Sequence, residues 1–130
     1  MIQHENNKQY RLDWYVEDKI LQITFYGHFS SEDAVDINQQ VTHWLDQHDD
    51  NLILLIDSLA LNTVTDFQNV RNKLTFVDNR RIRGIFILTR SKLIRLSLLV
   101  IFSLSPAMIK FFDSQTEAEQ FASNQLSVGL

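Results

Sequence analysis

Histidines are the first residues to consider in this sequence, because imidazole can act as an acid, a base or a metal ligand near neutral pH. All four histidines stand in the first half of the 130-residue chain. His43 and His48 are five residues apart in a segment with helical periodicity, whereas two side chains that share a helix face are three or four apart. We therefore predict surface histidines on a polar helix face and no metal site.

A serine and an aspartate stand where an apolar run, residues 52–56, ends. Ser58 occupies the place of the nucleophile in a strand-to-helix elbow, but the glycines that flank such a serine are missing. Asp57 is of more interest, because open α/β sheets bind ligands at the carboxyl ends of parallel strands. The structural alternative, which we favour, is that Asp57 accepts hydrogen bonds from the amides of the loop after it. The other possibility is a ligand site at the end of this strand, formed by Asp57, Ser58 and Thr65.

Glycines and cysteines, which carry many cofactor and metal motifs, are scarce. The three glycines, Gly27, Gly84 and Gly129, form neither GxGxxG nor GxxxxGK[ST], so nucleotide binding through either motif is not expected. The chain contains no cysteine, which excludes disulfides, thiolate metal ligands and cysteine nucleophiles. We expect no cofactor.

The charges are segregated along the chain, although the net charge is only −4. Residues 1–65 hold eleven acids and three bases, and residues 66–130 hold five acids and nine bases, eight of them in residues 71–95. A dedicated nucleic-acid domain usually has a basic isoelectric point, whereas that of this chain is near 5.4. We therefore interpret the bases as solvated side chains beside buried elements, and we expect no specific nucleic-acid partner.

Hydrophobic periodicity predicts the elements that position these side chains. Alternation with period two predicts a β-hairpin, and apolar runs between polar residues predict three further strands. Stripes with period 3.6, several with capping residues at their starts, predict four helices. The expected strands are the two of the hairpin at 10–27 and those at 52–56, 82–88 and 108–112, and the expected helices lie at 30–48, 65–79, 92–104 and 114–126.

The resulting order, ββαβαβαβα, predicts a single α/β domain. Strand-helix-strand crossovers require parallel pairing, so we expect a mostly parallel five-stranded sheet with the N-terminal hairpin as an antiparallel edge. No repeat or linker marks a boundary, so residues 1–130 are expected to form one domain, with an ordered core of about 8–127 and loose ends. The sequence shows no targeting or transmembrane segment, and we expect a cytoplasmic protein.

The helix expected at 92–104 is apolar on two sides. One stripe consists of Leu93, Leu96, Val100 and Leu104, and the other consists of Ile94, Leu98, Ile101 and Phe102. A helix that covers a sheet buries one stripe in its own domain, and the other would be an exposed patch of the kind that marks an interface. We predict a symmetric homodimer in which the stripe from Ile94 to Phe102 makes the contact and the stripe from Leu93 turns inward.

Four segments carry a resemblance to a known family. They are the end of the hairpin with the helix after it, FYGHFSSEDAVDINQQV, and the segments NLILLIDSLAL, IRGIFILT and MIKFFDSQTEAEQF. Together, over about residues 10–125, they resemble the SpoIIAA-like (STAS-type, anti-sigma factor antagonist-like) family, particularly its small bacterial members of unassigned function. The resemblance implies a mostly parallel sheet wrapped by helices. It also implies protein–protein recognition, or small apolar ligand binding in related folds, rather than catalysis.

The regulatory members of that family carry a phosphorylatable serine in an Asp-Ser-Ser-Gly-like turn. It stands at the start of the helix after the strand that corresponds here to 52–56. The corresponding residues of this chain, 63–67, read TVTDF and contain neither a serine pair nor a glycine. Thr65 is the hydroxyl residue at this helix start, and we predict that it caps the helix by accepting the amide hydrogen bond of Gln68. No phosphorylation site is carried over.

Three hypotheses for the function follow. The leading one is a non-enzymatic interaction or regulatory module that acts as a homodimer, with a bacterial regulatory protein as a further partner. The second is a small apolar ligand or lipid-binding protein, in which the helix at 92–104 is a lid. The third is an enzyme that uses Asp57 with His28 or His43.

Overall fold

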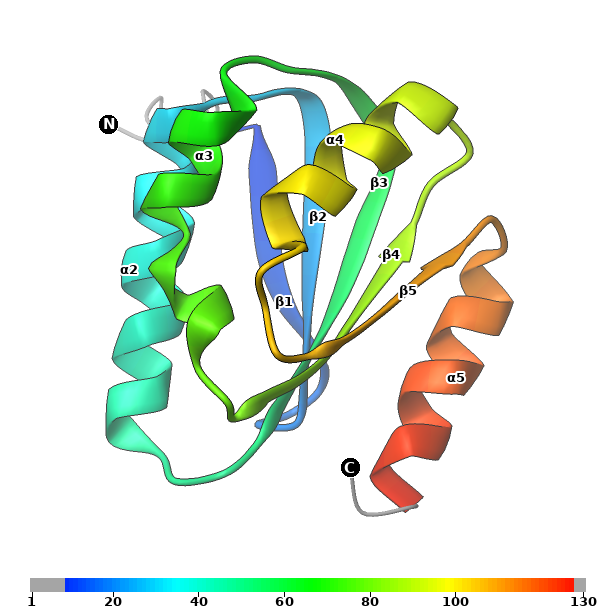
Figure 1. Cartoon of the computed structure of the whole chain (residues 1–130). Helices are drawn as coiled ribbons and strands as arrows, with labels where there is room; N and C mark the ends of the chain where they lie inside the picture. Colours follow the sequence, from blue (N-terminus) through cyan, green and yellow to red (C-terminus); the bar gives the residue numbers. More distant parts are fainter. Residues whose placement is uncertain (1–8, 128–130) are drawn as a thin grey trace, which may run out of the picture.

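A five-stranded mixed sheet forms the centre of the molecule (Figure 1). The computed structural model describes residues 9–127, so the expectation of loose ends at 1–7 and 128–130 lies outside the described residues. The strands are β1 (Tyr10–Val16), β2 (Ile20–Phe29), β3 (Leu52–Val64), β4 (Ile82–Leu88) and β5 (Met108–Phe112), in the order β1-β2-β3-β4-β5. β1 pairs with β2 antiparallel, and the other pairs are parallel. The predicted α/β fold with an antiparallel N-terminal edge is confirmed.

Helices cover the two faces of this sheet unequally. They are α2 (Ser31–Gln47), α3 (Phe67–Lys73), α4 (Lys92–Phe102) and α5 (Gln115–Ser127), with a short 3₁₀ helix, η1 (Thr75–Asp78), after α3. α2, α3 and α4 lie over one face and α5 lies over the other (Figure 1). The larger hydrophobic core is therefore under three helices, and the smaller one is under α5 alone.

β3 is buried on both faces, as its uninterrupted apolar run predicts. Leu52, Leu54 and Ile56 belong to the core under α2, α3 and α4, whereas Ile53 and Leu55 belong to the core under α5. The strand is longer than the predicted 52–56, because β2 continues to Phe29 and pairs with β3 as far as Val64. Asp57 and Ser58 consequently lie inside a strand rather than in a loop after it.

The helix predicted at 65–79 is divided into α3 and η1. Asn38, on α2, binds the backbone between them. Its side-chain oxygen accepts a hydrogen bond from the amide of Phe76 at 2.9 Å. The side-chain nitrogen of Asn38 also donates to Thr75 Oγ1 at 3.1 Å. An amide held in this way does not form the bond to the residue four positions earlier that continues an α-helix. Phe76 and Val77 are nevertheless buried, which explains why the apolar spacing looked helical.

Different hydrogen bonds stabilise the two ends of α2. At the start, Ser30 Oγ accepts the amide of Asp33 at 3.2 Å, and the Asp33 carboxylate accepts the amide of Ser30 at 3.4 Å, which is a capping box. The last turn of α2 has no basic residue of its own. Arg81, just before β4, donates instead to the carbonyls of Leu45 and His48, at 2.6 Å each. Arg81 therefore stabilises the carbonyl end of α2 from a distant part of the chain.

Candidate functional site

Asp57 is bonded to its own backbone neighbour. Its Oδ1 accepts the amide of Leu59 at 3.1 Å, which agrees with the structural alternative for this residue. The register between β2 and β3 shifts beside it, so the carboxylate satisfies an amide at a β-bulge. Asp57 also lines a cavity of about 10 Å³ next to α5, which has room for at most one water molecule. The space between Asp57 and α5 is therefore too small for a ligand of ordinary size.

Ser58 is a structural hydroxyl rather than a nucleophile. The residue is 2% exposed, and its Oγ donates to the carbonyl of Leu88, on β4, at 2.7 Å. The backbone register of β3 with β4 ends at Asp57 and Leu88, and the Ser58 hydroxyl adds one more link at that end. A hydroxyl that is closed to solvent and engaged with a carbonyl is not placed to attack a substrate.

His28 lies between two threonines near the end of β2. Its Nδ1 is 2.7 Å from Thr63 Oγ1, and its Nε2 is 3.1 Å from Thr65 Oγ1. The prediction that Thr65 caps the following helix is therefore wrong. Asp66 precedes α3 in the left-handed region, with φ of 52°, and this turn directs the Thr65 side chain to His28 instead.

The structure brings His28 and Thr65 together but keeps Asp57 away from them. On β3, Asp57 stands six residues before Thr63, the residue that pairs in register with His28. His43 is on α2, over the face of the sheet opposite to α5, whereas the small cavity beside Asp57 is lined by α5. The residues that the enzyme hypothesis requires are thus not assembled in one place.

α4 has one buried and one exposed apolar side, and they are the reverse of the prediction. Ile94, Leu98, Ile101 and Phe102 are all 0–3% exposed and belong to the larger core. What we call the outer surface of α4 consists of Leu93, Leu96, Leu99 and Val100 on the helix and Leu104 two residues after it, with exposed fractions of 71, 60, 42, 38 and 67%. The predicted contact stripe is therefore wrong, because the chain's own core buries it.

Two charged residues explain this rotation of α4. Lys92 is four residues before Leu96, and Arg95 is four residues before Leu99, so each charge shares a helix face with an outer leucine. Turning that face inward would also bury the charges, which is costly without partners. The position of Lys92 and Arg95 was the sequence signal that could have identified the inner stripe.

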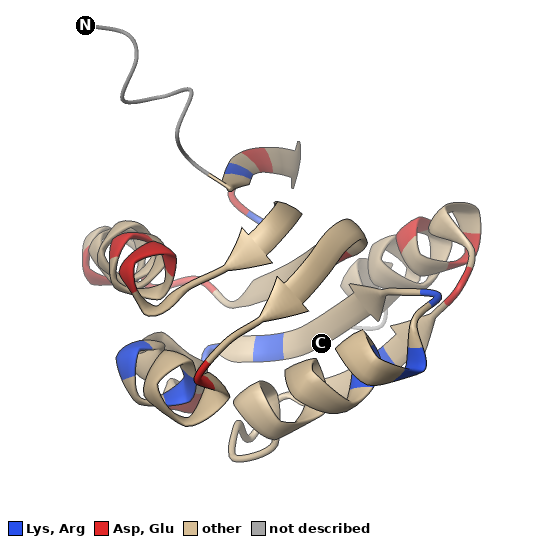
Figure 2. Cartoon of the chain, turned by 90° about the horizontal axis from the view of Figure 1, so that it is seen from above, with Lys and Arg blue, Asp and Glu red and all other residues tan. Residues whose placement is uncertain are grey.

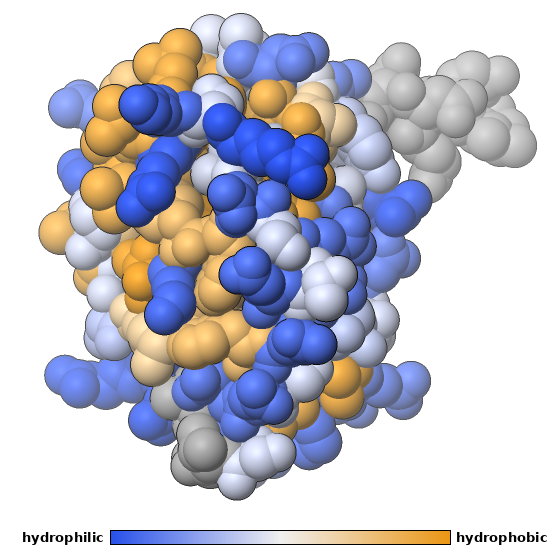
Figure 3. Space-filling view, turned by 90° about the vertical axis from the view of Figure 1, so that its right-hand side faces the viewer, coloured by the Kyte–Doolittle hydropathy of each residue, from blue (hydrophilic) through white to orange (hydrophobic). Residues whose placement is uncertain are grey.

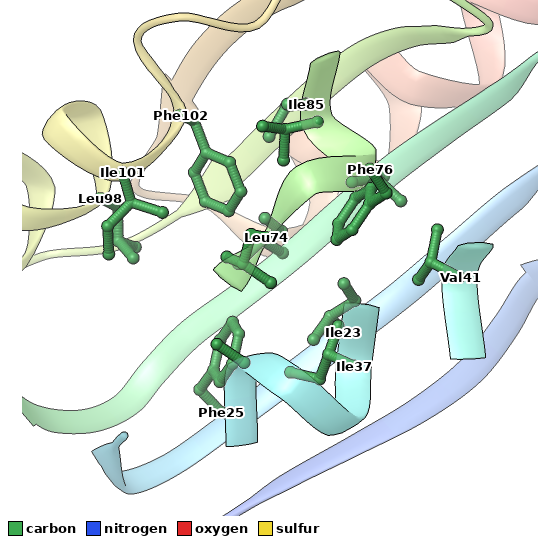
Figure 4. Packing of buried hydrophobic residues seen from close by; sticks show 14 of the residues in the cluster. Ile23, Phe25, Ile37, Val41, Leu74, Phe76, Ile85, Leu98, Ile101 and Phe102 are labelled. Carbon is green, nitrogen blue, oxygen red and sulfur yellow. The ribbon is translucent and has the colours of Figure 1, made fainter. Parts of the chain in front are cut away.

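The inner side of α4 fills the space between the helix and the sheet. Figure 4 shows Leu98, Ile101 and Phe102 directed into the same region as Leu74 and Phe25. All five side chains are at most 2% exposed. A lid over an apolar ligand would therefore require α4 to leave a packed core.

The bases at 71–95 occupy separate places in the fold. Figure 2 shows Lys and Arg on α3 and near the start of α4, whereas acids gather on α2. Several have structural partners: Arg81 caps α2, Arg90 Nε donates to the carbonyl of Asp113 at 3.2 Å, and the Arg95 guanidinium lies 4.7 Å from the ring centre of Phe111. Such placement is typical of structural and solvated bases.

A cavity that the sequence analysis missed lies between β1 and α2. Its volume is about 430 Å³, and its walls include both tryptophans of the chain, Trp14 and Trp44. The Trp44 ring stacks on His48, with centroids 4.3 Å apart and planes at 10°, and lies 5.7 Å from the Trp14 ring. Trp44 Nε1 donates to Asp18 Oδ1 at 3.1 Å. The available signal was the spacing of Trp44 and His48, because residues four apart share a helix face.

Residues 9–127 contain neither a membrane-spanning helix nor a cluster of metal ligands. No helix there combines the length and the apolar character that crossing a bilayer requires. In the same range, no three His, Asp or Glu side chains come close enough together to hold a metal ion.

Comparison with known proteins identifies the fold. No protein-family model matches the chain, and no curated protein sequence matches it. Among solved structures, the chain is similar to an uncharacterised protein of the DUF3478 family with a SpoIIAA-like fold, from Shewanella loihica PV-4. The similarity covers 87% of this chain and 91% of that one, with a TM-score of 0.66 and 17% sequence identity. The mixed sheet and its helices therefore form a SpoIIAA-like fold, as the sequence resemblance implies.

Proposed function

We propose that this protein is a non-enzymatic interaction module of the bacterial cytoplasm that forms a homodimer through the outer surface of α4. The observation that carries the proposal is the exposure of five large aliphatic side chains, four on this helix and one, Leu104, two residues after it. Figure 3 shows hydrophobic surface gathered at the upper left of the view, on the side of the molecule where α4 lies. Exposed apolar side chains gathered on one helix are typical of an interface.

Burial of this surface would supply the association energy. Complete burial of one Leu or Val side chain contributes roughly 1.5–3 kcal/mol. Two copies bring ten such side chains that are already partly buried, so the gross gain is on the order of 10 kcal/mol. Association itself costs about 4–15 kcal/mol in lost freedom. With the smallest of these costs the net gain is about 6 kcal/mol, which corresponds to a dissociation constant of roughly 40 μM and hence to a reversible dimer at concentrations of about 100 μM or above.

The charges of α4 favour an antiparallel pair of helices. Lys92 and Arg95 both lie in the first half of the helix. A twofold axis near the middle of α4 places the two first halves at opposite ends, so like charges are separated and the helix dipoles oppose each other. Leu96, Leu99 and Val100 would then lie near the axis.

Light scattering or sedimentation at protein concentrations up to about 500 μM tests this proposal. We expect the wild type to be a dimer and Leu96→Arg to be a folded monomer, with unchanged far-ultraviolet circular dichroism. Val35→Arg is the matched control, because it replaces an aliphatic residue with 37% exposure on α2 and should leave the dimer intact. A monomeric wild type refutes the dimer. A dimer that survives both Leu93→Arg and Leu96→Arg refutes the choice of surface.

The remaining parts of the proposal rest on the sequence resemblance and on residue placement. A bacterial regulatory protein is the further partner that the resemblance implies. We propose no catalytic residue, because Asp57, Ser58 and Thr65 each have a separate structural role. We propose no specific nucleic-acid partner, because the basic residues are dispersed among structural roles.

A further inference from the structure

We propose that the cavity between β1 and α2 binds a small organic cation with an apolar or aromatic body. Its volume of about 430 Å³ lies in the range of small-molecule sites. No residue that lines it belongs to α4, so this site is distinct from the proposed dimer surface. The proposal rests on three observations: an apolar floor, a fixed aromatic wall, and an excess of negative charge on the chain segments around the cavity, of which Asp13 is the carboxylate in the lining itself.

The floor of the cavity is apolar. It is formed by Leu12, Leu21, Val41 and Leu52, from β1, β2, α2 and β3. Leu21, Val41 and Leu52 are at most 8% exposed in the chain as a whole, so their positions are set by the core. Such a floor takes up the apolar part of a ligand without rearrangement.

The aromatic wall is held in place before any ligand arrives. Trp44 is fixed on one side by the stacked His48 ring and at its Nε1 by Asp18. Asp18 reaches it because the residue takes a left-handed conformation, φ 59°, in the turn between β1 and β2. Trp14 stands beside Trp44 and remains 38% exposed, so part of its ring is open. The face of an indole is the best aromatic partner for a cation.

The segments that form the walls carry more negative than positive charge. The acids of residues 10–20 and 40–52 are Asp13, Glu17, Asp18, Asp46, Asp49 and Asp50, and the nearby bases are Arg11, Lys19 and Arg81. Arg11 is already engaged, because its Nε donates to Asp13 at 2.6 Å, and this hydrogen bond raises the pKa of the guanidinium. Arg81 is engaged with backbone carbonyls at the end of α2. Both arginines keep their charge, so six acids and three bases leave these segments with a net charge of −3, which favours a cation over a neutral molecule or an anion.

Intrinsic fluorescence provides a specific readout for binding. Trp14 and Trp44 are the only tryptophans of the chain and both line the cavity, so their emission reports on this site. The probes are benzyltrimethylammonium as the cation, benzyl alcohol as the neutral ligand and hydrocinnamate as the anion. We expect saturable binding of the cation, with at least about tenfold higher affinity than for the other two. Equal affinity for all three probes, or no saturable response to the cation, overturns the proposal.

Two substitutions with a matched control locate the site. Asp18→Asn removes one negative charge but keeps an oxygen that can accept from Trp44 Nε1, and Asn tolerates the left-handed conformation. We expect Asp18→Asn to weaken binding of benzyltrimethylammonium several-fold. Trp14→Leu, measured by the remaining fluorescence of Trp44, should weaken binding further. Asp113→Asn, which makes the same charge change beyond β5 at the opposite edge of the sheet, should leave the affinity unchanged. Equal effects of Asp18→Asn and Asp113→Asn overturn the proposal.

Discussion

Replacing Arg81 measures how much a side chain from a distant part of the sequence contributes to the stability of α2. Its Nη1 donates to the carbonyls of His48 at 2.6 Å and Asp50 at 3.2 Å, and its Nη2 donates to the carbonyl of Leu45 at 2.6 Å. A hydrogen bond to a charged group contributes roughly 1.5–3 kcal/mol, and water replaces part of this where the bond is partly exposed. With about 1 kcal/mol for each of the two short bonds, Arg81→Ala should lower the free energy of unfolding by about 2 kcal/mol.

Urea denaturation followed by tryptophan fluorescence measures this loss, because Trp44 lies in the last turn of α2. Arg81→Lys keeps the charge but cannot reproduce the two-pronged geometry, so we expect it to restore no more than half of the lost stability. Arg83→Ala is the control, because this base is exposed on β4 and its removal should change the stability by less than about 0.5 kcal/mol. Equal losses for Arg81→Ala and Arg83→Ala, or full recovery with lysine, would refute the reasoning.

Two further substitutions test a side-chain hydrogen bond and a glycine conformation in the sheet. Ser58→Ala removes the donor to the buried carbonyl of Leu88 and should cost about 1–2 kcal/mol of unfolding free energy in the same urea assay. An unchanged urea midpoint would show that the carbonyl finds another partner. Gly27→Ala introduces a Cβ 2.5 Å from Gln9 Oε1 at a residue with φ of 55°, and should cost more than about 1 kcal/mol. A melting temperature equal to that of the wild type would contradict this steric argument.

The sequence by itself determined the order of the elements and the faces of the sheet. Period-two alternation located the hairpin, and the apolar run at 52–56 correctly indicated a strand buried on both faces. Capping residues indicated where helices start, and Ser30 caps α2 together with Asp33, three residues later. These features could be predicted because each depends on residues that are close together in the chain, where spacing alone fixes which side chains meet.

Only the tertiary structure decided features that depend on partners far away in the chain. Thr65 bonds His28 from 37 positions away rather than capping its own helix. Arg81 reaches back to α2, and Asn38 takes the amide of Phe76 and so ends the helix predicted across it. A local pattern does not show such competition, because a backbone or side-chain group can satisfy the same hydrogen bond with a neighbour or with a remote residue.

The cavity beside β1 belongs to the same class, whereas the rotation of α4 was mispredicted because the charges on the helix were not used. The two apolar stripes of α4 are similar in size and hydrophobicity, so periodicity alone did not rank them. The sheet selected the inner stripe because the alternative would bury Lys92 and Arg95. The cavity arises where an edge strand and a helix are placed side by side, and its walls bring together Trp14 and Trp44, which are 30 positions apart in the sequence. Spacing within one element cannot reveal a volume that lies between two.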